Sequence, residues 1–378
     1  MHLIQRYSLS TGLKINNPSI SEQFFPISAD KFVCFHTSAK DNLRDYDYWN
    51  EVKFILDPIL NKYGYKTIQI GFGKDPTANC DIDLRDKTSI RQMAYIVKKC
   101  NLFLGVDSFP AHLAGFFKRK MVSIYSNSFM ECVRPYWGER EDQILIETHR
   151  ADKEKPSFSF NENPKTVNRI KPEEIAIAAL KLLNLPSEKI NFKTINIGAR
   201  YKQECIEVIL SNEKCNLISN FMNVRMDINH DEQALYHILV NNNAEVTLTK
   251  PIDDELLFSK KITAINYVTE EFDIEFVKKI KKSGVNHTLL CTSKEKLAQQ
   301  RFNLFDFTIH LFEINEIIKT NKEKLPNLDL EKTKVQSNKK IICGNKVYET
   351  CYDFNNRRNE DDFFLDLDWY YLYNNQHE

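Results

Sequence analysis

The segment from Asn101 to His112 constrains the fold of this chain more than any other stretch. An apolar run, Leu102–Val106, stops at Asp107 and Ser108, and a proline then opens a helix. The next apolar run, Met121–Tyr125, predicts a second strand. In such a unit the free N–H groups of the helix start lie just beyond the end of the first strand, where a phosphate binds. The segment therefore predicts an anion site on an α/β unit.

The same pattern continues on both sides of this unit. Upstream, Thr88 or Ser89 is expected to cap a helix that ends with two lysines in its last turn. Further upstream, Phe32–His36 predicts a strand that ends in a small polar loop. Downstream, Pro172–Leu185 predicts an amphipathic helix that closes the first domain. Strands and helices that alternate in this way favour a parallel sheet.

The composition excludes several classes of protein. The chain has 378 residues, with 52 Lys and Arg against 52 Asp and Glu, so no global basic field attracts nucleic acid or an anionic membrane. No apolar run approaches the roughly 20 residues that cross a bilayer, and the first residues do not resemble a signal peptide. Nine scattered cysteines without a Cys-x-x-Cys pair are typical of reduced thiols. A cytoplasmic location is expected.

The pattern of apolar runs restarts after Pro186, which predicts three parts: residues 1–186, a second α/β domain over 187–335, and a tail over 336–378. In the second domain, helices are expected at Asp231–Val240 and Asp273–Lys282. The expected strands of this domain are Cys205–Leu210, Asn216–Phe221, Ala244–Thr249, His287–Cys291 and Thr308–Phe312.

The last 45 residues have a different character. Lys340–Glu349 predicts a hairpin that turns at Gly344 and Asn345. The acidic, aromatic stretch from Asp361 to Tyr373 has two interpretations, a packed tail that staples the two domains or a segment that binds a partner. The staple is favoured.

From about Lys31 to Leu185 the chain resembles the heptosyltransferase-like glycosyltransferases, family nine. Members carry Asp-Ser-Gly-x-x-His in the nucleotide-sugar half of a GT-B fold, and this chain has Asp107, Ser108 and His112 in that order. Phe109 stands where the family usually has glycine, so a very close backbone approach to the ligand is not expected there.

The resemblance implies an α/β chain with two Rossmann-like parallel-sheet domains arranged as in GT-B. The donor half comes second in the common GT-B order, yet only about thirty residues precede it here. The acceptor domain has therefore either been lost or follows the donor half. The second option, a permuted order with residues 187–335 as the acceptor half, is preferred.

The function implied is that of an inverting, metal-independent glycosyltransferase, which moves a sugar from a nucleoside-diphosphate sugar to a hydroxyl acceptor, expected to be a glycan. The nucleotide sugar is a co-substrate, and no cofactor or metal is expected. Whether the sugar is a hexose, heptose or pentose stays open. Asp107 is expected to orient a sugar hydroxyl or the loop, because like charges repel. The positions that match the family's phosphate loop, basic residue and motif are Thr37, Ser38, Lys40, Arg44, Asp107, Ser108 and His112.

An acceptor hydroxyl must lose its proton during transfer, which calls for a carboxylate or imidazole on the acceptor side. The stretch NVRMDINHDE in the second domain supplies candidates, and Asp227 is the predicted base. Asp231 is interpreted as the N-cap of the following helix. The predicted donor residues also have structural interpretations. Asp107 with Ser108 would serve as a helix cap, and Arg44 would form a surface ion pair.

Two other functions stay open. A non-catalytic protein could keep a glycosyltransferase-like scaffold for binding or assembly, which Phe109 and the uncertain base allow. A sugar transferase that acts on modified nucleic acid bases is the narrower alternative, and the neutral net charge does not favour it.

Overall fold

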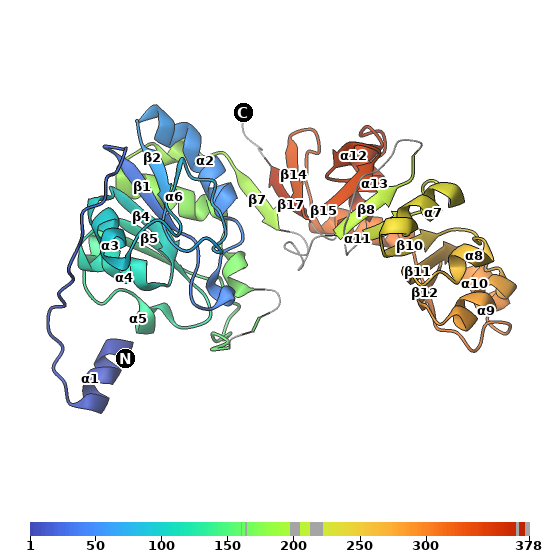
Figure 1. Cartoon of the computed structure of the whole chain (residues 1–378), viewed down its shortest axis with the longest axis horizontal. Helices are drawn as coiled ribbons and strands as arrows, with labels where there is room; N and C mark the ends of the chain where they lie inside the picture. The colour runs from blue at the N-terminus through green and yellow to red at the C-terminus, as the bar shows by residue number, and fades with distance from the viewer. Residues whose placement is uncertain (160, 163–164, 197–204, 212–221, 368–369, 375–378) are drawn as a thin grey trace. The chain divides into compact units, whose positions relative to one another are not determined.

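The computed structural model describes residues 1–378 except 160, 163–164, 197–204, 212–221, 368–369 and 375–378 (Figure 1). The described residues form two compact units, 1–194 and 195–374. Each unit has a largely parallel sheet and a core of its own, so the prediction of two α/β units built on parallel sheets is confirmed. None of the described helices has the length and apolar content needed to cross a bilayer.

The first unit contains a six-stranded sheet in the order β3-β2-β1-β4-β5-β6, and every neighbouring pair is parallel. This order is that of a doubly wound sheet, in which the winding reverses between β1 and β4. The strands are β1 (Phe32–His36), β2 (Lys66–Gln69), β3 (Ile82–Asp83), β4 (Leu102–Val106), β5 (Met121–Tyr125) and β6 (Gln143–Glu147).

Helices cover both faces of this sheet. On one face α3 and α4 share a core with Phe32, Cys34 and Phe103, and on the other α2 and α6 pack together, with Trp49 edge-on against Phe35. The helices of the unit are α1 (Leu3–Thr11), α2 (Trp49–Lys62), α3 (Ile90–Lys99), α4 (Phe109–Phe116), α5 (Met130–Val133) and α6 (Pro172–Leu183). Short 3-10 turns are η1 (Asn42–Arg44), η2 (Arg140–Asp142), η3 (Thr166–Arg169) and η4 (Ser187–Lys189).

The sequence-based boundaries of the first unit are largely confirmed. The strands β1, β4 and β5 have the predicted bounds, and Ser89, one of the two proposed caps, accepts a hydrogen bond from the backbone of α3. The last helix ends two residues early. Asn184 takes a left-handed backbone conformation with φ of 56° and terminates α6 there.

The second unit contains an eight-stranded sheet in the order β13-β12-β11-β10-β9-β8-β15-β16. From β8 to β13 each strand pairs in parallel with the next one along the chain. The strands are β8 (Cys205–Ile209), β9 (Met222–Arg225), β10 (Ala244–Leu248), β11 (Ile262–Thr269), β12 (Asn286–Cys291), β13 (Ile309–Leu311), β15 (Lys339–Cys343) and β16 (Lys346–Tyr348).

This sequential order affects where the helices lie. Right-handed crossovers that always advance in one direction return to the same face of a sheet. Accordingly, one buried cluster joins Leu235, Leu256 and Phe276 of successive helices to alternate residues of the strands, and Figure 1 shows α8, α9 and α10 along one side of β10–β12. The helices are α7 (Glu232–Asn241), α8 (Asp254–Leu257), α9 (Ile274–Ser283), α10 (Lys294–Gln300) and α11 (Ile314–Lys324).

The end of the chain forms a smaller packed layer. The predicted hairpin is confirmed, because β15 and β16 pair antiparallel across Gly344 and Asn345. The acidic, aromatic stretch is packed in the second unit, where Phe363 and Tyr370 lie in a buried cluster. A three-stranded sheet in the order β14-β17-β7 accompanies it. The remaining elements are β7 (Lys193–Asn196), β14 (Thr333–Ser337), α12 (Cys351–Phe354), α13 (Glu360–Leu365) and β17 (Tyr370–Asn374).

Two predictions for the second unit need comment. The strand expected at Asn216–Phe221 lies outside the described residues, and the described strand β9 begins directly after it. Arg225, which was expected in a loop, is the last residue of β9. The strand β11, the longest of the sheet, was missed.

Candidate functional site

The candidate site lies where the winding of the first sheet reverses. Ligands of doubly wound sheets bind outside the carboxyl ends of the strands at this point, because the neighbouring loops separate there. His36 ends β1 and Asp107 directly follows β4, with His36 paired in register to Gly105. The predicted donor residues that follow these two strands are therefore placed at the same edge of the sheet.

The loop after β1 is held from within the protein. Thr37 is fully buried, and its hydroxyl donates to the Pro76 carbonyl at 2.7 Å while it accepts from Gln69 Nε2 at 3.0 Å. The backbone N–H of Ala39 donates to Asp45 Oδ1 at 2.9 Å. The Thr37 hydroxyl is thus engaged in holding the loop, and Asp45 accepts a hydrogen bond from the same loop.

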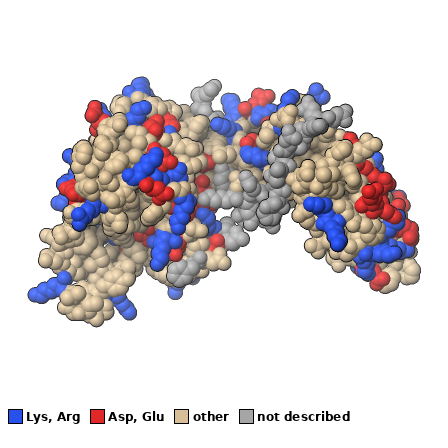
Figure 2. All heavy atoms as spheres, viewed as in Figure 1, with Lys and Arg blue, Asp and Glu red and all other residues tan. Residues whose placement is uncertain are grey.

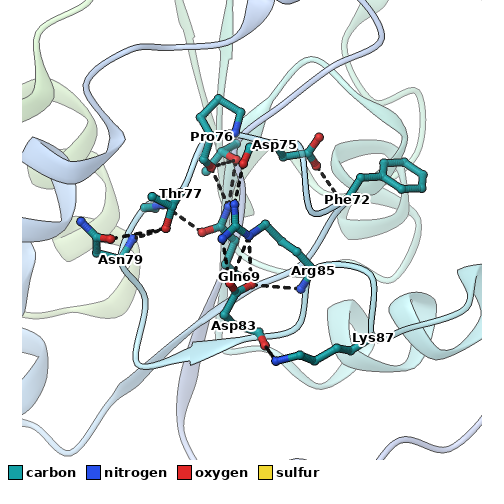
Figure 3. Close-up of polar contacts among 11 residues, drawn as sticks. Gln69, Phe72, Asp75, Pro76, Thr77, Asn79, Asp83, Arg85 and Lys87 are labelled. Carbon is teal, nitrogen blue, oxygen red and sulfur yellow. Dashed lines mark hydrogen bonds and ion pairs between the residues drawn. The ribbon is translucent and has the colours of Figure 1, made fainter. Parts of the chain in front are cut away.

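The loop after β2 forms a second polar network behind this edge (Figure 3). The Gln69 side chain donates to the Pro76 carbonyl at 2.7 Å, and Asp75 Oδ2 accepts from the Phe72 backbone N–H at 2.7 Å. Arg85 Nη1 donates to the carbonyl of Asp75 at 2.5 Å. These contacts hold the loop that carries the buried Asp75, whose charge acts on His36.

Arg44 links the two strand ends. Its Nη1 donates to both the carbonyl and Oδ2 of Asp107, at 3.0 and 3.1 Å, and its Nη2 pairs with Asp41 at 3.1 Å. The Nε of Arg44 is buried and has no hydrogen-bond partner among the described residues. Because buried donors are normally satisfied, this nitrogen is a candidate contact for a bound anion. Arg44 is therefore both a structural ion pair and a possible ligand group.

Asp107 and His112 form a titratable pair at the start of α4. Burial raises the pKa of the Asp107 carboxyl above its ordinary value, although Arg44 and His112 oppose the shift. Burial lowers the pKa of His112, against the attraction of Asp107. The Asp107 carboxylate accepts a hydrogen bond from Arg44, and its predicted role of orienting a sugar hydroxyl or the loop stays a prediction.

Ser108 occupies the N-cap position of α4 without capping it. Its hydroxyl lies 3.0 Å from His36 Nδ1 and 3.1 Å from the Val106 carbonyl. The start of α4 therefore has no side-chain acceptor of its own, which is the condition under which a helix N-terminus receives an anion. Phe109, the first residue of the helix, is half exposed beside it.

The remaining predicted donor residues lie on the same loop. Ser38 is buried and its hydroxyl contacts the Ala39 carbonyl at 3.2 Å. Lys40 is exposed, and it forms no ion pair with any residue in the described part of the chain. It is therefore free to reach a ligand at this edge.

His36, the last residue of β1, lies beside Ser108 at this edge. Burial lowers its pKa to about 4, with Asp75 opposing. The imidazole is therefore neutral at physiological pH and serves as a hydrogen-bond partner of Ser108.

We expect this burial to make the first unit sensitive to acid. Because the pKa of His36 falls from its ordinary value of 6.5 to about 4 on folding, the unfolded chain binds more protons between these values. Stability is then complete above about pH 6.5 and is lost as the pH falls through about 4, by on the order of 3 kcal/mol. Urea unfolding across this range should show the loss, and it should be smaller in His36→Asn. Equal pH dependence in the two proteins would contradict it.

The predicted base lies at the end of β9 in the second unit. Asp227 accepts from Arg225 through both oxygens, at 2.8 and 2.7 Å, and Arg225 Nη1 also pairs with Glu207 at 2.6 Å. Lys339 Nζ lies 2.9 Å from Glu207 Oε1 and pairs with Asp366. Asp227 is thus one end of a charge network whose other members come from β8, β9, β15 and the C-terminal layer.

The network is mostly buried and joins three carboxylates to two cations. Burial raises the pKa of Glu207, but Lys339 and Arg225 together outweigh it and hold that pKa below its ordinary value. For Asp366 burial dominates and the pKa is raised. Since the five side chains pair with one another, a structural role accounts for the network. Its distant members could not be predicted from residue spacing.

The segment that follows Asp227 leads into α7. Asp231 caps this helix, because its Oδ1 accepts from the Ala234 backbone N–H at 2.9 Å, which confirms the predicted cap. His230 lies between them, with Nε2 3.4 Å from a Glu232 carboxylate oxygen and Nδ1 buried without a partner among the described residues. His230 is a second titratable group near the predicted base.

The distribution of charge and of potential metal ligands completes the description. Figure 2 shows Lys and Arg interspersed with Asp and Glu over the visible surface of the first unit. No broad surface of one sign appears on that face. Over the residues that the structure describes, no group of three or more His, Cys, Asp or Glu side chains is placed to hold a metal ion.

Part of the chain matches the model of a known protein family. Residues 74–161 match the model of glycosyltransferase family 9 (heptosyltransferase). The matched segment includes Asp107, Ser108 and His112, and it excludes the loop after β1. No curated protein matches the chain.

Several solved structures resemble part of the chain. They include ADP-heptose LPS heptosyltransferase II of E. coli (16% identity, 42% of this chain and 48% of that chain, TM-score 0.33) and a family 9 glycosyltransferase of Veillonella parvula (19%, 48% and 50%, 0.33). The iron-containing dodecameric glycosyltransferase TibC of enterotoxigenic E. coli is a third (15%, 44% and 49%, 0.33). The matches span about half the length of these proteins. The first unit of this chain thus contains a segment that matches the model of glycosyltransferase family 9, and this segment forms part of the edge where the winding reverses.

Proposed function

We propose that the protein is an inverting, metal-independent glycosyltransferase that moves a sugar from a nucleoside-diphosphate sugar to a hydroxyl acceptor. The observation that carries the proposal is the start of α4, which has no side-chain cap and lies beside Arg44. The start of α4 is within the segment that matches family 9, and Arg44 precedes that segment. Such a helix end and a guanidinium supply fixed positive charge for a diphosphate.

The donor site we propose uses the groups at the ends of β1 and β4. The leaving diphosphate gains negative charge in the transition state, so donors and positive ends fixed in advance stabilise it. Arg44, Ser108 and His112 are the proposed contacts, with Lys40 reaching from the loop after β1. Thr37 and Ser38 shape that loop, and Asp107 holds Arg44 in place.

For the acceptor side we propose the second unit, as in a permuted GT-B arrangement, with a glycan as the acceptor. Asp227 is the proposed base. Both of its oxygens contact Arg225 in this structure, so base catalysis requires the acceptor hydroxyl to reach a remaining lone pair of the carboxylate beside the guanidinium. This requirement makes Asp227 the most exacting part of the proposal.

Diphosphate binding is expected to need no magnesium. The positive end of α4 and the side chains of Arg44 and Lys40 supply the charge that a Mg²⁺ ion supplies in other nucleotide sites. Calorimetric titration with UDP, ADP, GDP and CDP should give the same affinity with and without EDTA. A large loss of nucleoside diphosphate affinity in the presence of EDTA would contradict the metal-independent mechanism.

A thermal-shift screen with UDP-, ADP-, GDP- and CMP-linked sugars tests the function as a whole. A ligand that binds only the native state stabilises it by mass action and so raises the unfolding temperature. At a ligand concentration of a hundred times Kd, the free energy of unfolding rises by about 2.7 kcal/mol. One nucleotide class should stabilise the protein and should then support transfer to an added glycan. No stabilisation by any of them would reject the donor site.

A non-catalytic scaffold is the second candidate function, and the Arg225–Asp227 pair favours it. A carboxylate with both oxygens engaged is what a purely structural network would contain. This candidate predicts nucleotide-sugar binding without turnover, so the same screen followed by a transfer assay separates the two functions.

A further inference from the structure

Ser108 behaves differently from the other serines that begin described α-helices. Ser89 and Ser293 each accept from the backbone N–H three residues on, at 3.3 Å. Ser108 instead turns its hydroxyl towards His36 and Val106. Since a serine N-cap normally stabilises its helix, something must hold this one away.

The ring of His36 is well placed to do so. His36 pairs in register with Gly105, where an added Cβ would lie 2.9 Å from the His36 carbonyl oxygen. At Gly71, whose φ of 136° favours glycine, an added Cβ would lie 3.5 Å from His36 Cδ2. The two glycines let the surrounding backbone approach closely, and the ring packs against Gly71 while its Nδ1 faces Ser108.

The hydrogens of this contact can be assigned from the partners. The Val106 carbonyl can only accept, so it takes the hydroxyl hydrogen of Ser108. A neutral imidazole carries one N–H, and a hydrogen at Nδ1 donates to the Ser108 oxygen. When an anion arrives, the hydroxyl hydrogen can turn towards it while Nδ1–H keeps the oxygen in place.

We propose that His36 is a positioning residue of the donor site. Its Nδ1–H holds the Ser108 hydroxyl away from the backbone of α4, so that the helix start and the hydroxyl hydrogen both stay available to a diphosphate. This inference rests on the proposed function, because that function identifies the ligand as a diphosphate. The contact between His36 and Ser108 stands on the structure alone.

The first test needs no ligand. Nitrogen-15 NMR of the His36 ring should show the Nδ1–H tautomer, and Ser108→Ala should move the Nδ1 resonance while the exposed His149 stays unchanged. A ring protonated only at Nε2 would make Ser108 the donor and overturn the proposal. An unmoved resonance in Ser108→Ala would overturn it as well.

The second test uses amides that mimic one ring nitrogen each. His36→Asn places an N–H near the position of Nδ1, whereas His36→Gln reaches the position of Nε2 and His36→Leu removes both. Calorimetry with nucleoside diphosphates should show binding about tenfold weaker in the Gln and Leu variants and nearly unchanged in the Asn variant. Circular dichroism confirms that each variant is folded.

The outcomes separate the two claims. Tight binding by His36→Leu, or an Asn variant as weak as the Leu variant, would overturn the positioning role while the donor site stands. Failure of the wild-type chain to bind any nucleoside diphosphate would overturn the proposed function, and with it the role assigned to His36. Near-normal diphosphate binding in His36→Asn, together with weakened binding in His36→Gln, would support both the donor site and the positioning role.

Discussion

Arg44→Ala is expected to weaken nucleoside diphosphate binding by roughly 2 to 5 kcal/mol, because the variant removes a partly buried cation from the proposed donor site. Arg44→Lys should also weaken binding, since the charge is kept but the forked geometry and the unpartnered Nε are lost. Calorimetric titration with the diphosphate found in the thermal-shift screen measures both. The order wild type, Lys, Ala is the expected ranking.

A loss of binding could also come from damage to the loop, since Arg44 holds Asp107. Removing one partner of a buried pair leaves an uncompensated carboxylate. Arg44→Ala combined with Asp107→Asn removes that carboxylate and should recover stability in urea without recovering binding. Asp107→Asn alone keeps an acceptor for the guanidinium and is the matched control. A double variant that binds as tightly as the wild type would leave Arg44 with a structural role only.

Asp227→Asn is expected to lower turnover by about two to four orders of magnitude while donor binding survives. Asparagine keeps the shape and one acceptor for Arg225, and it removes the basicity that an acceptor hydroxyl requires. Single-turnover kinetics with saturating donor measure the chemical step. Because Asp227 also satisfies Arg225, the stability of the variant has to be measured beside its rate.

Asp231→Ala is the matched control for this experiment. Asp231 caps α7, so its loss should cost about 1 kcal/mol of stability with little effect on transfer. If Asp227→Asn turns over normally and Asp231→Asn does not, the two roles are reversed. If both turn over normally, His230 is the next group to test.

The first unit could be predicted closely because its signals are local. The strand Leu102–Val106 is entirely apolar and ends in two polar residues, and Ser89 with Gln92 forms a capping box that is readable from the sequence. The reversal of winding between β1 and β4 could be expected only through the family resemblance. It depends on which strands pair across a long connection, and no local pattern encodes that.

The second unit was harder to predict for a physical reason. Strand β11 mixes polar and apolar residues because one face packs on helices while Asn266 on the other face contacts Glu245, so the strand lacks a continuous apolar run. A strand covered on one face alternates polar and apolar residues, and such a pattern is easily missed when continuous apolar runs are sought. The predicted helices at Asp231–Val240 and Asp273–Lys282 were found within one or two residues, since both have aspartate caps.

At the candidate site, residue types could be predicted but not their partners. Arg44, Ser108 and His112 were expected at one edge, and their strands place them there. That Thr37 is buried and bonded to Gln69, or that Ser108 faces His36, depends on side-chain directions across two strands. Such contacts join residues far apart in the sequence, so composition and spacing do not reveal them.

The neighbour-to-neighbour order of β8–β13 implies a particular way of folding. Each new strand completes its pairing with the strand just made, so loop closure is short at every step, and contact order within this stretch is low. In the first unit, by contrast, β1 must wait for β4, with β2, β3 and two helices made in between. The second sheet can therefore grow or fray from β13 one strand at a time, much as repeat proteins do, whereas the edge between β1 and β4 forms only when the intervening strands and helices have been made.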